Sequence, residues 1–143
     1  MAGELAVNVL LDTCALLALA RGDLPPRAAS ALRTAVEASV SAVSPWEVAI
    51  KSASGKIRLA EPPQQWFLGL TERYGLRELP LDAHTACAAA ELPLIHRDPF
   101  DRVLVVPVLE IAFSYPIGCF AGNIPVIVAV EDDSELTDRF ART

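Results

Sequence analysis

Four acidic side chains from separate parts of the sequence are the residues best suited to chemistry. Asp12 follows an apolar segment, Glu47 lies in the motif SPWEVAIK, and Asp98 and Asp101 lie in the motif HRDPFDR. If these carboxylates converge in space, their oxygens form the kind of pocket that Mg²⁺ or Mn²⁺ prefers. A cation held in this way polarises a phosphate and activates a water for attack. The acids therefore indicate phosphodiester hydrolysis, provided that the fold brings them together.

Each of these acids also has an ordinary structural explanation. Glu47 follows Ser44 by the three positions that separate the two residues of a capping box. Asp12, Asp98 and Asp101 lie where helices are predicted to start, and there an acid caps the helix or interacts favourably with its dipole. On this pattern alone, capping is the better interpretation of Glu47. Residues that cap separate helices need not lie close together, whereas the ligands of a metal site must. Spatial convergence therefore separates the two explanations.

The elements around Asp12 predict where its side chain lies. Residues 5–12 form a nearly continuous apolar segment that favours a strand buried on both faces of a parallel sheet. Residues 13–20 fit a short helix that stops near Gly22. Asp12 is therefore predicted at the carboxyl end of a strand, where ligands gather in open α/β sheets.

The rest of the sequence continues the alternation of strands and helices. We expect helices over residues 26–39, from a cap at Ser44 to about Gly55, after Pro63, over 82–92 with Asp82 as the cap, and from Pro99 to about Glu110. We expect strands over residues 39–44, 77–81 and 124–130, with an edge strand within 111–118. Pro107 should kink or shorten the helix that Pro99 opens. This pattern predicts an α/β fold with a parallel sheet.

Composition limits the class of protein. The 143 residues are 52% apolar and show no repeat or linker, which predicts one domain, with residues 131–143 as an acidic tail or short helix. No apolar segment is long enough to span a bilayer and the amino terminus is a poor secretory signal, so we expect a cytoplasmic protein. The three cysteines lack metal-site or disulfide spacing and are interpreted as reduced, mostly buried hydrophobic residues. The formal charge of −6 argues against nucleic-acid binding by bulk electrostatics, but acids around a cation do not exclude a nuclease.

Basic and aromatic residues near the acids have two interpretations each. The candidates for phosphate contacts are Lys51, Lys56, Arg97 and Arg102. Their alternative role is ordinary surface charge of small energetic value. His96 is more simply a solvated loop residue than a general base. Trp46 and Trp66 could stack on bases, although a Trp beside apolar helix positions more often packs in a core or an interface.

Three motifs in this order resemble a known family. They are LLDTCALLAL at residues 10–19, SPWEVAIKSASGKI at 44–57 and LPLIHRDPFDRVLV at 92–105. The chain resembles the PIN-domain ribonucleases, and within them the toxin subunits of VapBC-type toxin–antitoxin pairs. This resemblance implies a three-layer α/β/α domain with a mostly parallel sheet, in which acids bind Mg²⁺ or Mn²⁺ and RNA is cut. It also implies a homodimer and a cognate antitoxin protein that fills the groove near the acids, with helices 63–74 and 27–39 as contact surfaces.

The resemblance assigns roles to individual residues. Asp12 matches the family's first acid, Glu47 the second and Asp101 the third, while Asp98 matches an extra acid found in the DPFDR subgroup. These acids are expected to be catalytic, with Asp12, Glu47 and Asp101 as metal ligands. Thr13 could orient Asp12 or a metal-bound water, and it could equally be a helix-start residue.

The sequence departs from the family pattern after Val105. The family's fourth acid ends a Thr-x-Asp triplet, and the best alignment places Ser114, Tyr115 and Pro116 there. The remaining acids could suffice, because Mg²⁺ tolerates few protein ligands. Alternatively, the chain is a degenerate member with little activity. Asp132 and Asp133 could also reach back, but their place beyond the predicted last strand argues against it.

The preferred hypothesis is thus a toxin-like, metal-dependent endoribonuclease in which a metal-activated water attacks phosphorus. The main alternative is a PIN-like binding or regulatory module that lost catalysis with its fourth acid. A weaker alternative is a phosphatase-like enzyme with Asp12 as the nucleophile. That mechanism normally needs a second Asp two residues later, where Cys14 stands.

Overall fold

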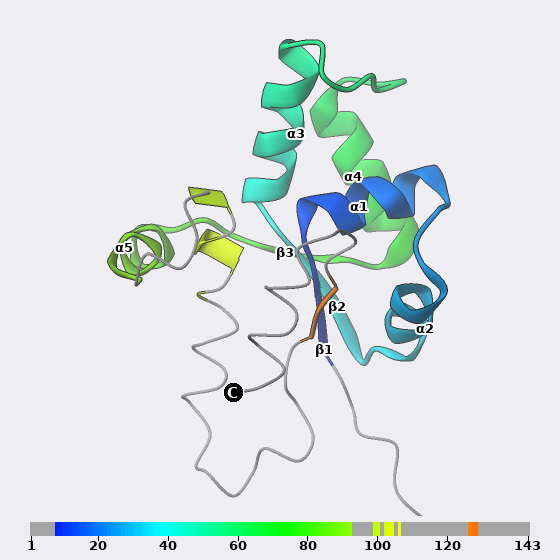
Figure 1. The fold of residues 1–143 in the computed structure, drawn as a ribbon, viewed down its shortest axis with the longest axis horizontal. Coiled ribbons are helices and arrows are strands. Elements are labelled where there is room, and N and C mark those ends of the chain that lie inside the picture. Colours follow the sequence, from blue (N-terminus) through cyan, green and yellow to red (C-terminus); the bar gives the residue numbers. More distant parts are fainter. Residues whose placement is uncertain (1–7, 93–98, 101, 105, 107–125, 129–143) are drawn as a thin grey trace, which may run out of the picture.

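The computed structural model describes residues 8–92, 99–100, 102–104, 106 and 126–128 (Figure 1). The elements in chain order are β1 Asn8–Leu11, α1 Thr13–Arg21, α2 Pro26–Thr34, β2 Glu37–Ser41, α3 Val43–Ala53, α4 Pro63–Tyr74, β3 Arg77–Leu79, α5 Ala83–Glu91 and β4 Val126–Val128. Residues 99–100, 102–104 and 106 are also helical and are called the Pro99 helix below. The predicted edge strand at 111–118, the effect of Pro107 and the tail at 131–143 lie outside the described residues.

The strands form one parallel sheet in the order β3-β2-β1-β4. Strand β1 lies between β2 and β4, with Leu11 opposite Val40 on one side and Val128 on the other. Because every described pairing is parallel, the carboxyl ends of the strands share one edge of the sheet. The predicted α/β fold with a parallel sheet is confirmed.

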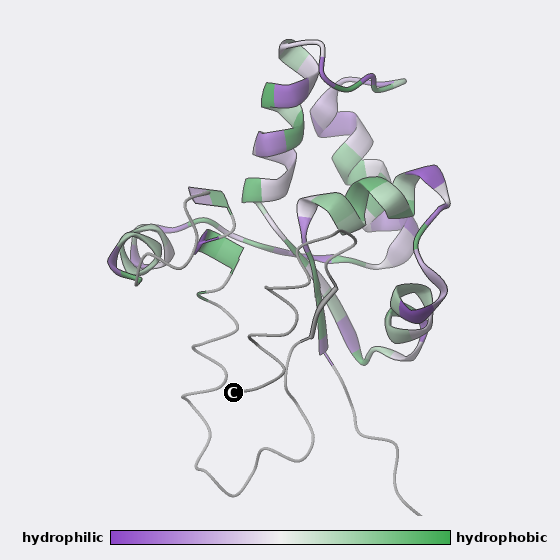
Figure 2. Cartoon of the chain, viewed as in Figure 1, coloured by the Kyte–Doolittle hydropathy of each residue, from purple (hydrophilic) through white to green (hydrophobic). Residues whose placement is uncertain are grey.

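Alternate residues of β1 face opposite sides of the sheet, and each side is covered by helices. Val9 and Leu11 belong to a core cluster with Leu16 of α1 and Phe67 of α4, and residues of α2 pack against its margin. Leu10 belongs to a second cluster with Val43 and Leu104. Three layers result, with α1, α2 and α4 on one face and the Pro99 helix on the other (Figure 1). Figure 2 shows β1 and α1 as mostly hydrophobic, as expected for central elements.

The helix predicted over residues 26–39 was too long. It ends at Thr34, because Ala35 takes an extended conformation and Glu37–Ser41 form β2. The strand predicted over 39–44 therefore begins and ends earlier. Residues 35–39 include Ala and Glu, which suit a helix, but pairing of β2 with both β1 and β3 supplies hydrogen bonds that local propensity does not predict.

The predicted start of α3 was also wrong. The helix begins at Val43 with Ala42 as its N-cap, and no side chain bonds to the helix from the cap position. Instead, the Ser41 hydroxyl accepts a hydrogen bond from the Val43 amide at 3.2 Å. Ser44 lies inside the helix and is fully buried. The capping box predicted for Ser44 and Glu47 therefore does not form.

Other helix ends follow the predictions. Gly22 ends α1 in a left-handed conformation with φ of 75°, α4 begins at Pro63, and Asp82 caps α5 by accepting a hydrogen bond from the Thr85 amide at 2.8 Å. That bond lowers the pKa of the Asp82 carboxyl. Within the described part of the chain, no helix has the length and apolar character needed to cross a membrane.

Two of the three cysteines are not buried as predicted. Cys14 and Cys87 are both exposed, and Cys119 lies outside the described residues. Cys14 follows Thr13 on α1, whose buried positions are Thr13, Ala15, Leu16, Ala18 and Leu19, so its side chain is on the opposite face of the helix. Cys87 lies on α5, where Ala89 is the buried residue. The packing interpretation of cysteine therefore fails at these two positions.

Candidate metal and RNA site

Asp12 lies at the carboxyl edge of the sheet, as predicted. It directly follows β1 and caps α1, where its Oδ1 accepts a hydrogen bond from the Ala15 amide at 2.7 Å. The residue is half-buried. The capping role is therefore real, and it fixes the carboxylate at the edge where parallel strands present ligands.

A buried hydrogen bond joins the start of α1 to the start of α3. Thr13 Oγ1 donates to Ser44 Oγ at 3.1 Å, between residues 31 positions apart in the sequence. Thr13 is 5% exposed and Ser44 is fully buried. This bond brings the helix that Asp12 caps against the first turns of the helix that contains Glu47. Thr13 is the first residue of α1, as its helix-start interpretation expects, and the bond to Ser44 gives it a further structural role.

Glu47 forms an ion pair on its own helix. Its Oε1 lies 2.8 Å from the Lys51 Nζ, and the two side chains are 14% and 36% exposed respectively. The capping box does not form, and the ion pair with Lys51 one turn along α3 is the structural role that Glu47 has. The carboxylate is instead held largely out of solvent and beside a cation, near the helix end that contacts Thr13.

The third motif contributes the Pro99 helix, which packs beside the first two. The Phe100 ring contacts the Trp46 ring edge to face, with centroids 5.3 Å apart and planes at 82°. Leu104 packs with Leu10 and Val43. Described residues from all three motifs therefore contact one another. His96, Arg97, Asp98 and Asp101 lie outside the described residues, so their roles stay predictions.

The predicted phosphate contacts have different surroundings. Arg102 donates from Nε to the Ala89 carbonyl at 3.0 Å and from Nη2 to the carbonyls of Ala90, at 3.2 Å, and Leu92. These bonds satisfy carbonyls at the end of α5, as basic side chains often do. They favour a structural role for Arg102 over a phosphate contact. Lys51 pairs with Glu47, and Lys56 is exposed after the end of α3.

The donor chemistry at this edge fits a hard divalent cation. Among the described residues, no three His, Cys, Asp or Glu side chains gather closely enough to hold a metal ion, and half of the predicted acids are not described. The described pair, Asp12 and Glu47, offers carboxylate oxygens from helices whose starts are bonded together. Mg²⁺ often takes only one or two direct carboxylates and retains water. Within these limits the residues suit Mg²⁺ or Mn²⁺.

Sequence reasoning named Thr13 and Ser44 but did not predict that buried polar side chains hold this edge together. The buried polar side chains of the described chain are Thr13, Ser41 and Ser44, and all three follow or end a strand at the carboxyl edge. Burial of a hydroxyl is unfavourable without a hydrogen bond. The clue in the sequence was the pair of Ser residues, Ser41 and Ser44, at the predicted turn from strand to helix.

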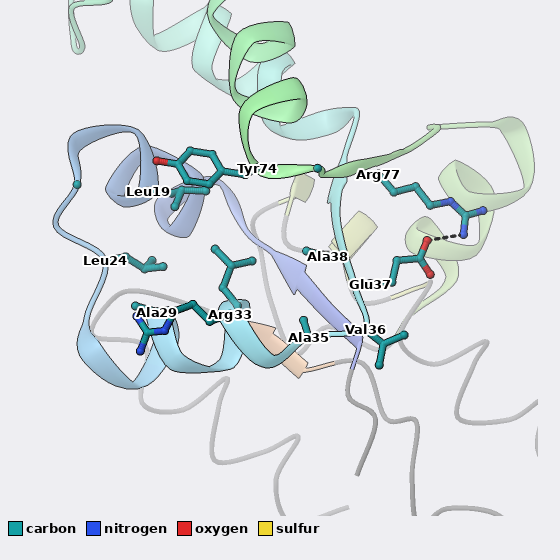
Figure 3. Close-up of a pocket in the computed structure, with 13 residues that line it drawn as sticks. Leu19, Leu24, Ala29, Arg33, Ala35, Val36, Glu37, Ala38, Tyr74 and Arg77 are labelled. Atoms are coloured by element: carbon teal, nitrogen blue, oxygen red, sulfur yellow. Dashed lines mark hydrogen bonds and ion pairs between the residues drawn. The ribbon is translucent and has the colours of Figure 1, made fainter. Parts of the chain in front are cut away.

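A cavity of about 660 Å³ lies at the other edge of the sheet. It is open to solvent and lined by residues of α1, α2 and α4, and by Glu37, the first residue of β2 (Figure 3). The figure shows Tyr74 beside Leu19 and the ion pair between Arg77 and Glu37, whose Nη1 and Oε1 atoms are 2.9 Å apart. Because β2 starts here and ends near Asp12, this cavity is separate from the acidic edge.

Comparison with known families decides the relationship that the three motifs suggest. The pattern of the PIN domain matches residues 9–111, which is most of the chain. The chain belongs to the PIN-domain family. Members of this family are generally metal-dependent nucleases, and many act in toxin–antitoxin systems. The match spans the positions of all the predicted acids up to Asp101 and ends before β4. No curated protein matches the sequence.

Proposed function

We propose that this PIN-domain protein is a metal-dependent endoribonuclease and the toxin of a toxin–antitoxin pair. The observation that supports it most directly is the Thr13–Ser44 hydrogen bond of 3.1 Å. It joins two segments that are remote in sequence, one capped by Asp12 and the other containing Glu47. A shared cation site needs the starts of these two helices to lie close together, and the bond shows that they do.

The residues that would hold Mg²⁺ or Mn²⁺ are Asp12, Glu47 and Asp101, with Asp98 assisting. When bound, the cation supplies Lewis acidity to the scissile phosphate and lowers the pKa of an attacking water. The chain's own contribution is preorganisation. The Ala15 amide fixes the Asp12 carboxylate, whereas Lys51 pairs with Glu47 and would compete with the cation for that carboxylate. The amino termini of α1 and α3 add positive potential at the edge where a phosphate would lie.

The proposed partners of the nuclease are an antitoxin and a second copy of the chain. The proposed contact surfaces include α4 and the segment from α2 into β2. Val36 in that segment is 70% exposed, and Leu68 on α4 is 51% exposed. Each proposed surface thus offers one exposed apolar side chain to a partner.

The test compares Asp12→Asn with Asp82→Asn in cleavage of a panel of RNAs in Mg²⁺ or Mn²⁺. Both aspartates cap a helix through an amide three residues later, at 2.7 Å for Asp12 and 2.8 Å for Asp82. Asn caps a helix about as well as Asp, so both variants keep the cap and lose only a charge. The pair therefore separates the metal role of Asp12 from its structural role.

We expect Asp12→Asn to reduce cleavage by at least about 10- to 100-fold, the loss that follows even from removing a group that supports a metal ligand. Asp82→Asn should cleave like the wild type. Equal cleavage by both variants and the wild type would remove the catalytic assignment. RNA binding without cleavage by the wild type would favour the degenerate binding module instead.

A further inference from the structure

An apolar strip lies beside the proposed site on the outer face of α3. Trp46 and Ile50 are one helical turn apart and are 55% and 47% exposed. Glu47 and Lys51, which form the ion pair, follow them on the adjacent strip of the same helix. Hydrophobic and hydrophilic positions accordingly alternate along α3 in Figure 2. Among the described aromatic side chains, the most exposed one therefore lies one residue away from a predicted metal ligand.

The orientation of the Trp46 indole is constrained although most of it is exposed. Phe100 contacts it edge to face at 5.3 Å, and Phe100 itself packs against the Leu10, Val43 and Leu104 cluster. In an edge-to-face contact each ring leaves at least one face uncovered by the other. A ring that is held in place and still open on a face loses little side-chain entropy when a planar partner stacks on it.

The charge of the chain explains why stacking is needed. A protein with formal charge −6 gains little from bulk attraction to a phosphate backbone. Of the predicted phosphate contacts, Lys51 pairs with Glu47 and Arg102 donates to carbonyls at the end of α5. Base stacking on an aromatic side chain contributes about 1–3 kcal/mol per base and needs no positive charge. The narrow Trp46–Ile50 strip suits one base better than a broad protein interface, which buries about 800 Å² on each partner.

We propose that Trp46 stacks on an unpaired base of a single-stranded RNA substrate and so positions the adjoining phosphate beside Asp12 and Glu47. This inference rests on the proposed nuclease function, because it assigns Trp46 to that substrate. Trp46 thus sets the substrate class, which must offer an unstacked nucleotide next to the cleaved bond. Perfectly paired RNA does not offer one.

The chain has two tryptophans, so the Trp66→Phe variant leaves Trp46 as the sole indole reporter. Trp66 packs at the margin of the core, and Phe keeps an aromatic ring there. The variant is titrated in EDTA with a short oligoadenylate and, separately, with an abasic ribose-phosphate oligomer of equal length. Oligoadenylate should quench the Trp46 fluorescence to saturation, while the abasic oligomer should leave it unchanged. Equal quenching by both oligomers, or oligoadenylate binding without quenching, would overturn the proposal.

Affinity measurements on variants give a second test. Trp46→Leu should weaken oligoadenylate binding by roughly 5- to 150-fold, and Trp46→Phe should retain most of the affinity. Leu81→Ala is the control, because Leu81 is an apolar side chain that is 37% exposed and remote in sequence from the strip. If Trp46→Leu changes the oligomeric mass and not the RNA affinity, the strip is a protein contact and the proposal is wrong.

Different results would contradict the stacking role of Trp46 and the nuclease function. If the wild type cleaves RNA and Trp46→Leu binds and cleaves equally well, the stacking role is wrong and the nuclease function stands. If no RNA is cleaved but oligoadenylate still quenches Trp46, the nuclease function is wrong and the base contact stands.

Discussion

The helix cap that Asp12 forms is compatible with its proposed role as a metal ligand. Its Oδ1 accepts the Ala15 amide, as the capping interpretation predicts. An ionised carboxylate offers about four lone-pair sites, and a cap of this kind uses one of them. The cap therefore orients the group without excluding a cation. For Glu47 the two interpretations do separate, because α3 begins at Val43 and leaves Glu47 too far into the helix to cap it.

Lys51 has two possible effects, competition with the cation at Glu47 and contact with a phosphate, and they can be measured separately. Its ammonium is 2.8 Å from Glu47 Oε1, so a divalent cation must compete with it. We expect Lys51→Met to tighten Mg²⁺ binding by about 2- to 5-fold, which corresponds to the energy of a partly exposed ion pair. If Lys51 contacts a phosphate, as the sequence predicts, RNA affinity should fall at the same time. Magnesium and RNA titrations of the same variant measure both effects.

The matched control for this prediction is Lys56→Met. Lys56 is exposed just beyond the end of α3, and it carries the same charge. Its removal should leave Mg²⁺ affinity close to that of the wild type. Unchanged Mg²⁺ affinity in Lys51→Met would show that the ion pair does not oppose metal binding at Glu47.

At the scale of elements, the sequence predicted most helix ends but not the boundary between α2 and β2. Gly22, Pro63 and Asp82 mark helix ends through local backbone chemistry, so their signals are readable from a few neighbouring residues. Residues 37–41 are extended because they pair with strands on both sides, and those partners are remote in sequence. Local patterns cannot contain that information.

The joining of α1 and α3 was likewise invisible in the sequence, and it is open to test through Thr13→Val. This substitution keeps the shape of the side chain and removes the donor to Ser44. Loss of a buried hydrogen bond should lower the free energy of unfolding by about 1–3 kcal/mol. Mg²⁺ affinity should also fall, because the helices that present Asp12 and Glu47 are no longer bonded. Urea denaturation and metal titration check the two effects.

Thr13→Ser is the control that keeps the hydroxyl. It should retain most of the Mg²⁺ affinity even if the lost methyl group reduces stability slightly. A destabilised Thr13→Val protein with wild-type Mg²⁺ affinity would show that the bond supports the fold alone.

At the scale of the whole molecule, the sheet places β4, which comes late in the sequence, beside β1, which comes first. Residues 124–130 were predicted as a strand, and Val126–Val128 form β4, but its neighbour could not be predicted. Buried parallel strands are apolar on both faces and offer no alternation that would specify partner or register. The structure pairs β4 with β1, so that Leu11 lies opposite Val128 and both strands end at one edge. Asp132 and Asp133 themselves lie outside the described residues, so whether they reach Asp12 stays a prediction.

This topology suggests a source for the fourth acid that the alignment at Pro116 lacks. In the sequence, Glu131, Asp132 and Asp133 follow β4 within five residues of Val128. If one of them serves as the missing ligand, replacing all three with Gln or Asn should weaken Mg²⁺ binding roughly 10-fold or more. Glu135→Gln combined with Asp138→Asn removes charge farther along the same segment and should have little effect. Because both variants lower the negative charge, the comparison separates a ligand from a general electrostatic contribution. The opposite result is unchanged Mg²⁺ binding in the triple variant and tighter Mg²⁺ binding in Pro116→Asp. It would show that the missing ligand corresponds to position 116.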